Sequence, residues 1–189
     1  MTTSRILLAP ILALVTVLAL GACGGDQPSG DTRTDDAGRA YSSADVAFVS
    51  EMIQHHADAL SMVDLTLDRD LSPEVQSLVE DIRATRGPEI EEMTDLLQEW
   101  DEPVPETSRH HANAHAEDHG DDEGTSALEQ VSDADFEQVF LEQMITHHEE
   151  AIDMARTEQE QGTHQRVVEL SRQIETAQRK EIELMESLL

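Results

Sequence analysis

The chain has 189 residues, of which 12 are lysine or arginine and 41 are aspartate or glutamate, so its formal net charge is −29. Such an acidic surface repels nucleic acid and attracts cations, which excludes a nucleic-acid partner and suits metal capture, although a coat for solubility explains the same charge. Aromatic residues are only 3% of the chain, so the core must come from aliphatic side chains and methionine, which favours helices over a sheet.

Residues 1–22 have the features of a secretory signal peptide, because Arg5 precedes an apolar run that ends in small residues. Cys23, the only cysteine, follows directly, and this arrangement resembles the lipobox of bacterial lipoproteins. We therefore expect lipidation of Cys23, an extracytoplasmic location and attachment to the membrane through the lipid. A plain signal peptide that happens to precede a cysteine, or an uncleaved anchor, is the alternative. The polar residues 23–43 are predicted to be the lipid attachment site and a flexible linker.

Apolar residues with a helical period follow this linker. They predict a helix from about Asp45 to Arg69. Ser72 supplies an N-cap, and the proline after it a favourable first-turn residue, for a second helix that ends near Trp100. Residues 44–102 are therefore predicted to form a first helical hairpin.

A polar, acidic linker, residues 103–131, separates this hairpin from a second one over residues 132–189. Ser132 is expected to cap the third helix, and Gly162 and Thr163 to end it and cap the fourth. The linker is a possible site for borderline metal ions or a solvated spacer. Its candidate ligands are His110, His111, His115 and His119.

The two hairpins are copies of one another, offset by 92 positions. The offset relates three pairs of methionines: Met52 and Met144, Met62 and Met154, and Met93 and Met185. One hairpin alone is too small to bury its apolar stripe, so the two are predicted to pack as one all-α, four-helix bundle.

Each copy places a methionine one helical turn before a His-His doublet. The residues are Met52, His55 and His56, and Met144, His147 and His148. Antiparallel pairing within each hairpin brings Glu89 and Glu181 to the same level, and if the first helices of both hairpins run in the same direction, all eight side chains meet in one layer. Thioether and imidazole ligands suit a soft or borderline ion such as copper, Cu(I) in particular, and nearby carboxylates help to accommodate Cu(II).

The other methionines are ambiguous. Met62 lies about 15 Å along the helix from Met52, so it cannot complete the same site, and Met154 has the same relation to Met144. Either these residues, with Met93 and Met185, are ligands at other levels, or they fill the core. A purely structural role is also open for the doublets, but adjacent imidazoles are unfavourable to bury without partners.

Two other classes of function remain open. Ferritin-type di-metal oxidases use Glu-x-x-His motifs, whereas the matching positions here begin with Met52 and Met144, so a carboxylate is replaced by a thioether. A metal-free structural or sensory bundle is the third class. No combination of nucleophile, base and orienting group is visible, so we do not predict an enzyme.

The combined pattern resembles the bacterial family known as domain of unknown function 305 over residues 43–189. The resemblance rests on Phe-x-x-x-Met-x-x-His-His-x-x-Ala-x-x-Met, followed on the next helix by Glu-Ile-x-x-Met. It implies a ferritin-like four-helix bundle, an extracytoplasmic location and copper as the bound metal. Sequestration, delivery or resistance is then the expected role, with an unknown metallochaperone or transporter as partner.

The two copies differ from the family pattern in one respect. The second keeps the expected glutamine, Gln178, before Glu181, whereas the first has Arg86-Gly87-Pro88 before Glu89. A proline inside a helix removes a backbone hydrogen bond and favours a kink. The first half of the site is therefore predicted to be altered, with Arg86 either opposing a metal ion or pairing with a carboxylate.

Overall fold

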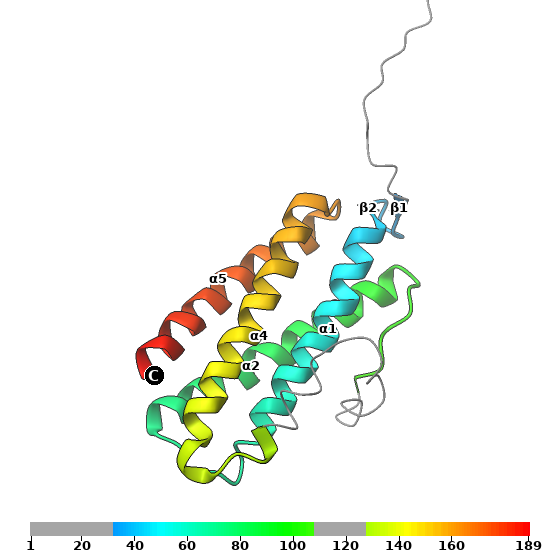
Figure 1. Cartoon of the computed structure of the whole chain (residues 1–189). Helices are drawn as coiled ribbons and strands as arrows, with labels where there is room; N and C mark the ends of the chain where they lie inside the picture. Colours follow the sequence, from blue (N-terminus) through cyan, green and yellow to red (C-terminus); the bar gives the residue numbers. More distant parts are fainter. Residues whose placement is uncertain (1–31, 108–127) are drawn as a thin grey trace, which may run out of the picture.

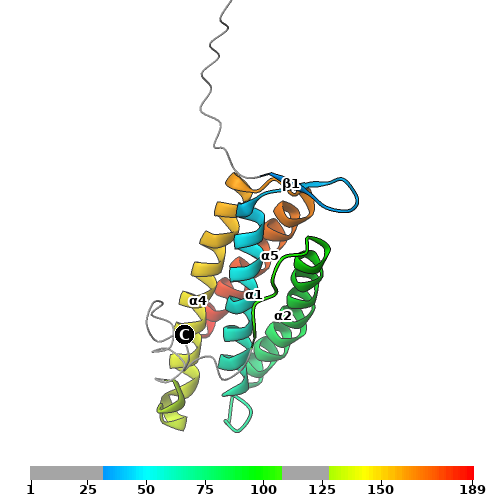
Figure 2. The same ribbon diagram turned by 90° about the vertical axis from the view of Figure 1, so that its right-hand side faces the viewer.

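The structure, a computed structural model, describes residues 32–107 and 128–189, and most of these lie in four long helices (Figure 1). The helices are α1 (Ser43–Asp64), α2 (Pro73–Glu99), α4 (Asp133–Gln161) and α5 (Gln165–Leu188). α1 and α4 pack against one another, while α2 packs on α1 and α5 packs on α4 (Figure 1, Figure 2). The predicted all-α, four-helix bundle is confirmed.

The first helices of the two hairpins, α1 and α4, run in opposite directions (Figure 1). In Figure 1, α1 starts at the end of the bundle where α4 finishes. Asp45, near the start of α1, accepts a hydrogen bond from the backbone N–H of Thr163, which follows α4, at 3.0 Å. The pseudo-twofold axis between the hairpins therefore crosses the bundle, and the arrangement in which both first helices run the same way is wrong.

Local capping explains where α1 and α2 begin. Ser42 and Asp45 form a reciprocal capping box at the start of α1. The hydroxyl of Ser72 accepts from the backbone N–H of Val75 at 3.3 Å, as expected for the predicted N-cap of α2. α2 continues as one helix through Pro88 and ends, as predicted, at Trp100, its C-cap.

Two helix ends differ from the prediction. α1 stops at Asp64 rather than near Arg69, because the chain tightens into turns in which the hydroxyl of Thr66 donates to the carbonyl of Val63 at 2.6 Å. The N-cap of α5 is His164, not Thr163. The cause is tertiary: the backbone N–H groups of both residues donate to Asp45, so neither depends on a hydroxyl cap.

The core divides into two clusters of buried side chains along the bundle. The first contains Met52 and Met93, with Met154 packed against it. The second contains the remaining three helical methionines, Met62, Met144 and Met185. Since each cluster combines methionines from both hairpins, the duplicated sequence produces a core that is symmetric about its centre.

Residues 32–42, assigned from composition to the flexible linker, form an ordered strap across one end of the bundle. β1 (Arg33–Thr34) pairs antiparallel with β2 (Ala40–Tyr41). The turn between them needs Gly38, whose φ is 77°, and Tyr41 then stacks on Trp100 of the α2 C-cap with ring centroids 4.6 Å apart. This long-range aromatic contact, together with the ion pairs of Arg33 with Glu102 and Arg39 with Glu99, holds the polar segment against the bundle.

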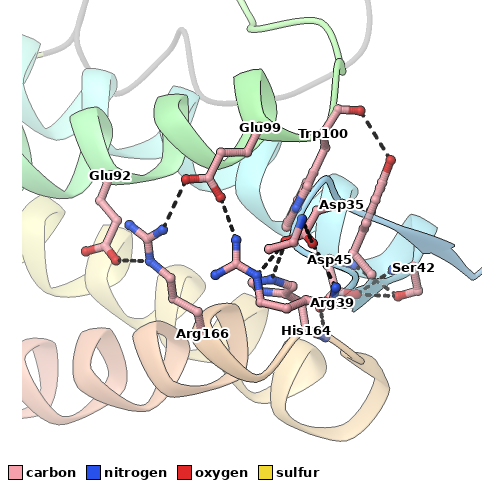
Figure 3. A network of polar contacts seen from close by, with 11 residues as sticks. Asp35, Arg39, Ser42, Asp45, Glu92, Glu99, Trp100, His164 and Arg166 are labelled. Atoms are coloured by element: carbon pink, nitrogen blue, oxygen red, sulfur yellow. Dashed lines mark hydrogen bonds and ion pairs between the residues drawn. The ribbon is translucent and has the colours of Figure 1, made fainter.

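The strap and the α4–α5 turn meet around one buried carboxylate, Asp45 (Figure 3). Asp45 accepts from the backbone N–H and the hydroxyl of Ser42, both at 2.7 Å, and from the N–H of His164 at 2.8 Å. Burial and the neighbouring Asp45 raise the pKa of Glu158 to about 9, so Glu158 keeps its proton at neutral pH. Glycine is favoured at position 162 because a Cβ there would lie 2.6 Å from the backbone carbonyl oxygen of Glu158.

Glu158→Gln should weaken the pH dependence of stability. Between the ordinary pKa of 4.5 and the folded value of about 9, the unfolded chain loses the Glu158 proton while the folded chain keeps it. The contribution of protonated Glu158 to the free energy of unfolding is therefore complete below pH 4.5. It is lost as the pH rises through the folded pKa of about 9. We expect the variant to gain on the order of 1–3 kcal/mol in free energy of unfolding at about pH 8, as measured by urea denaturation. Equal pH profiles for variant and wild type would contradict this assignment, and exposed Glu160→Gln is the matched control.

Several predicted features lie outside the described residues: the signal peptide, Cys23, and the linker histidines His110, His111, His115 and His119. Leu128, at the end of the predicted linker, is described and is buried in the second core cluster. None of the helices in residues 32–107 and 128–189 is long and apolar enough to cross a membrane.

Candidate metal centre

The histidine doublets of the two hairpins meet at the middle of the bundle. The rings of His55 and His147 face one another across the α1–α4 interface, with centroids 3.7 Å apart. Both side chains are half-buried, but all four of their ring nitrogens are shielded from solvent and have no hydrogen-bond partner among the described residues. Only Glu150 approaches, at 3.7 Å from Nε2 of His55, which is too long for a hydrogen bond.

The second histidine of each doublet is held by a glutamate of the same hairpin. Nε2 of His56 lies 2.8 Å from Oε2 of Glu89, and Nε2 of His148 lies 2.5 Å from Oε2 of Glu181. A neutral imidazole that donates its Nε2–H to a carboxylate leaves Nδ1 with a free lone pair. In both residues Nδ1 is buried and has no partner within the described structure. We refer to these four histidines and two glutamates as the His/Glu layer.

Arg86 enters the layer from α2 and joins the two hairpins. Its guanidinium contacts Oε2 of Glu181 at 2.5 Å, Oε2 of Glu89 at 3.4 Å and Nε2 of His148 at 3.3 Å. The side chain is 1% exposed. Of the two roles that the sequence left open, pairing with carboxylates is therefore the one observed.

The environment favours the neutral form of three of these imidazoles, those of His56, His147 and His148. Burial lowers the pKa of His56 to about 4, against the raising effect of Glu89. Burial also lowers the pKa of His147 well below its usual value, helped by the nearby imidazoles and by the positive charge of Arg86. The pKa of His148 falls mainly for the same reason, despite its bond to Glu181. Neutral imidazole is the form that binds metal.

The surroundings of Glu181, in contrast, favour its charged form. Burial alone would raise the pKa of its carboxyl, but the hydrogen bond from His148 and the charge of Arg86 outweigh that effect, so the pKa is lowered. Glu181 is therefore ionised, as its ion pair requires.

Met52 and Met144 flank the His/Glu layer from opposite sides. Because α1 and α4 are antiparallel, Met52 shares the first core cluster with Ala151 of α4, and Met144 shares the second with Ala59 of α1. The prediction that both methionines occupy one layer with the histidines is therefore wrong. Each remains one turn from its own doublet and fully buried.

The remaining methionine candidates lie deeper in the two core clusters. Met93 and Met185 are fully buried, Met62 is nearly so, and Met154 packs at the edge of the first cluster. Their surroundings are apolar side chains, which is the environment of core-filling methionine.

Sequence reasoning gave too little weight to two residues at this level. Gln178, the counterpart of Arg86, is buried, and its side-chain oxygen has no partner within the described residues. The second residue is Glu150 of α4. Its approach to His55 depends on the antiparallel packing of α1 and α4, which a repeat does not reveal.

The donor chemistry of the layer fits copper, since imidazole suits this metal and thioether suits its reduced form. Within the layer, six buried nitrogens of its four imidazoles have no hydrogen-bond partner among the described residues. In residues 32–107 and 128–189, no three His, Cys, Asp or Glu side chains already converge on one point where a metal ion could sit. Metal binding at this layer therefore requires the imidazole rings to turn.

Similar proteins give this geometry a context. The profile of the family described as Domain of unknown function (DUF305) matches residues 45–189. A DUF305 fragment from Deinococcus radiodurans has a TM-score of 0.66 and 31% identity, over 78% of this chain and 96% of that one. A DUF305 protein from Streptomyces coelicolor described as secreted has a TM-score of 0.64 and 28% identity, over 77% of this chain and 90% of that one.

CopM, whose structure is known with Cu(I), Cu(II) and silver, is also similar. Its Cu(I)-bound form has a TM-score of 0.62 and 28% identity, over 76% of this chain and 94% of CopM. No match was found among curated proteins. Because the family profile covers most of the chain and the solved structures share its fold, the chain belongs to the DUF305 family.

Proposed function

We propose that this protein binds copper at the His/Glu layer and serves in copper sequestration, delivery or resistance outside the cytoplasm. The observation that carries the proposal is the facing pair His55 and His147, whose four ring nitrogens are buried and lack partners within the described residues. Buried polar atoms without partners are unfavourable and rare in folded proteins. A bound metal ion would satisfy nitrogens of both rings.

The surrounding residues would support such an ion in distinct ways. His55 and His147 would hold it directly, and His56 and His148 could add their free Nδ1 atoms. Glu89 and Glu181 fix the tautomers of the second histidines, the usual role of a carboxylate behind a metal-binding imidazole. Met52 and Met144 would offer a soft ligand from either side, which suits Cu(I).

The relatives support both the metal and the compartment. CopM binds Cu(I), Cu(II) and silver within the same fold, and the Streptomyces coelicolor protein is described as secreted. The signal-like residues 1–22 and Cys23 add lipid anchoring to this proposal. A copper carrier needs no catalytic group, so we propose no enzymatic role, and the protein that would receive or supply the ion is a metallochaperone or transporter.

His55→Ala combined with His147→Ala should weaken Cu(I) binding at the layer by at least about 100-fold, because it removes both central ligands. Anaerobic isothermal titration of the full chain with Cu(I) measures the affinity and stoichiometry. His115→Ala combined with His119→Ala is the matched control, since it removes two linker imidazoles and should leave the tight site intact. If the layer variant binds Cu(I) as the wild type does, the assignment is wrong.

A further inference from the structure

The two hairpins carry different residues at the centre of the His/Glu layer. Arg86 of α2 and Gln178 of α5 are equivalent in the repeat, and both side chains are almost completely buried. Arg86 brings a full positive charge into contact with Glu89, Glu181 and His148, whereas Gln178 is neutral. A fixed cation thus stands beside a set of residues otherwise suited to hold cations.

The formal charges of the layer follow from these contacts. Imidazoles bind metal in their neutral form, so the charge of the occupied site is set by the two carboxylates and the one guanidinium. Two negative charges therefore face one positive charge, and the sum without the ion is −1. Glu150 also approaches His55, but it is 51% exposed, and water screens its charge. Uncompensated charge is unfavourable in a buried site, so the layer is neutral when it holds one monovalent ion and carries an excess positive charge with a divalent ion.

We infer that Arg86 is a specificity-determining residue that matches the charge of this site to a monovalent soft cation, Cu(I) or Ag(I), and disfavours divalent ions. The inference rests on the proposed metal binding at the His/Glu layer. In this role the guanidinium is not a ligand. Arg86 neutralises one of the two carboxylate charges, so only one negative charge remains to balance the bound ion.

Coulomb's law predicts how Arg86 changes the relative affinities for divalent and monovalent ions. A fixed charge repels a divalent ion twice as strongly as a monovalent ion at the same position. Removing it therefore favours both ions, but the divalent one more. For charges a few ångströms apart in a partly buried site, the ratio of divalent to monovalent affinity should rise by about 10- to 100-fold.

The test compares the affinities of the full chain for Ag(I) and Zn(II) by isothermal titration. In Arg86→Gln, which installs the residue type found at position 178, the ratio of Zn(II) to Ag(I) affinity should rise by about 10- to 100-fold. Arg86→Lys keeps the charge and should stay close to the wild-type ratio. Arg83→Gln, on the same helix and paired at the surface with Asp64, changes net charge equally and should leave the ratio unaltered.

Glu89→Gln supplies an independent check because it removes one negative charge, so the same ratio should fall. A purely structural role for Arg86 would change stability in these variants without changing the ratio. If folded Arg86→Gln has the wild-type ratio, or if Glu89→Gln fails to lower it, the inference is overturned while copper binding stands. If the wild-type layer binds no Ag(I), both the proposed function and the inference fail.

Discussion

Replacing Arg86 with leucine should lower the free energy of unfolding of the metal-free protein by about 3–5 kcal/mol. The leucine fills much of the volume but leaves Glu89 and Glu181 without their shared cation in a partly buried layer. Removing one partner of a buried ion pair is far more damaging than its net contribution suggests, because the remaining charge stays desolvated. Urea denaturation of the metal-free chain measures the loss.

The control for this prediction is Arg83→Leu. Arg83 lies on the same helix and pairs with Asp64, but both side chains are partly solvent-exposed. Such a pair contributes about 1 kcal/mol or less, so its loss should be small. Equal losses for the two variants would mean that Arg86 does not organise the layer.

Asp45→Ala should be similarly destabilising, by about 3–5 kcal/mol, because one carboxylate satisfies donors from two distant segments. The backbone N–H groups of Ser42, Thr163 and His164 all donate to it. Without Asp45 these groups lose their acceptor in a buried environment, and Glu158 loses the neighbouring carboxylate. The α1 capping box and the α4–α5 turn should loosen together, and thermal unfolding monitored by circular dichroism would record the loss.

Asp153→Ala is the matched control, since the side chain of Asp153 is 80% exposed and that of its partner Arg156 is 51% exposed. Its effect should stay within about 1 kcal/mol. A small loss for Asp45→Ala would show that the two segments are held by other contacts, such as the stacking of Tyr41 on Trp100.

Much of the fold follows from local signals in the sequence. Apolar periodicity and the N-cap at Ser72 located the first two helices, and the repeat implied a bundle of two hairpins. The relative direction of the hairpins did not follow, because a repeat joined by a long linker permits either pseudo-twofold axis. The strap was missed because its order depends on Trp100, which lies far away in the chain. The capping box of Ser42 and Asp45, two residues visible in the sequence, could have placed the start of α1 correctly.

In the candidate site, too, some features follow from the sequence and others depend on the tertiary structure. The doublets His55-His56 and His147-His148 were singled out from spacing alone, and their glutamate partners from the expected level of the hairpin. The placement of Met52 and Met144 on opposite sides depended on helix direction, which spacing cannot supply. The partners of Arg86 come from both hairpins, so only the tertiary structure reveals that it bridges Glu89 and Glu181.

Anomalous diffraction from crystals of the Cu(I)-loaded chain tests the central claim most directly, because it locates the ion itself. The proposed function predicts a copper peak between the imidazoles of His55 and His147, with the rings turned toward it. A layer without copper, with all anomalous signal at the linker histidines His110 to His119, would contradict it.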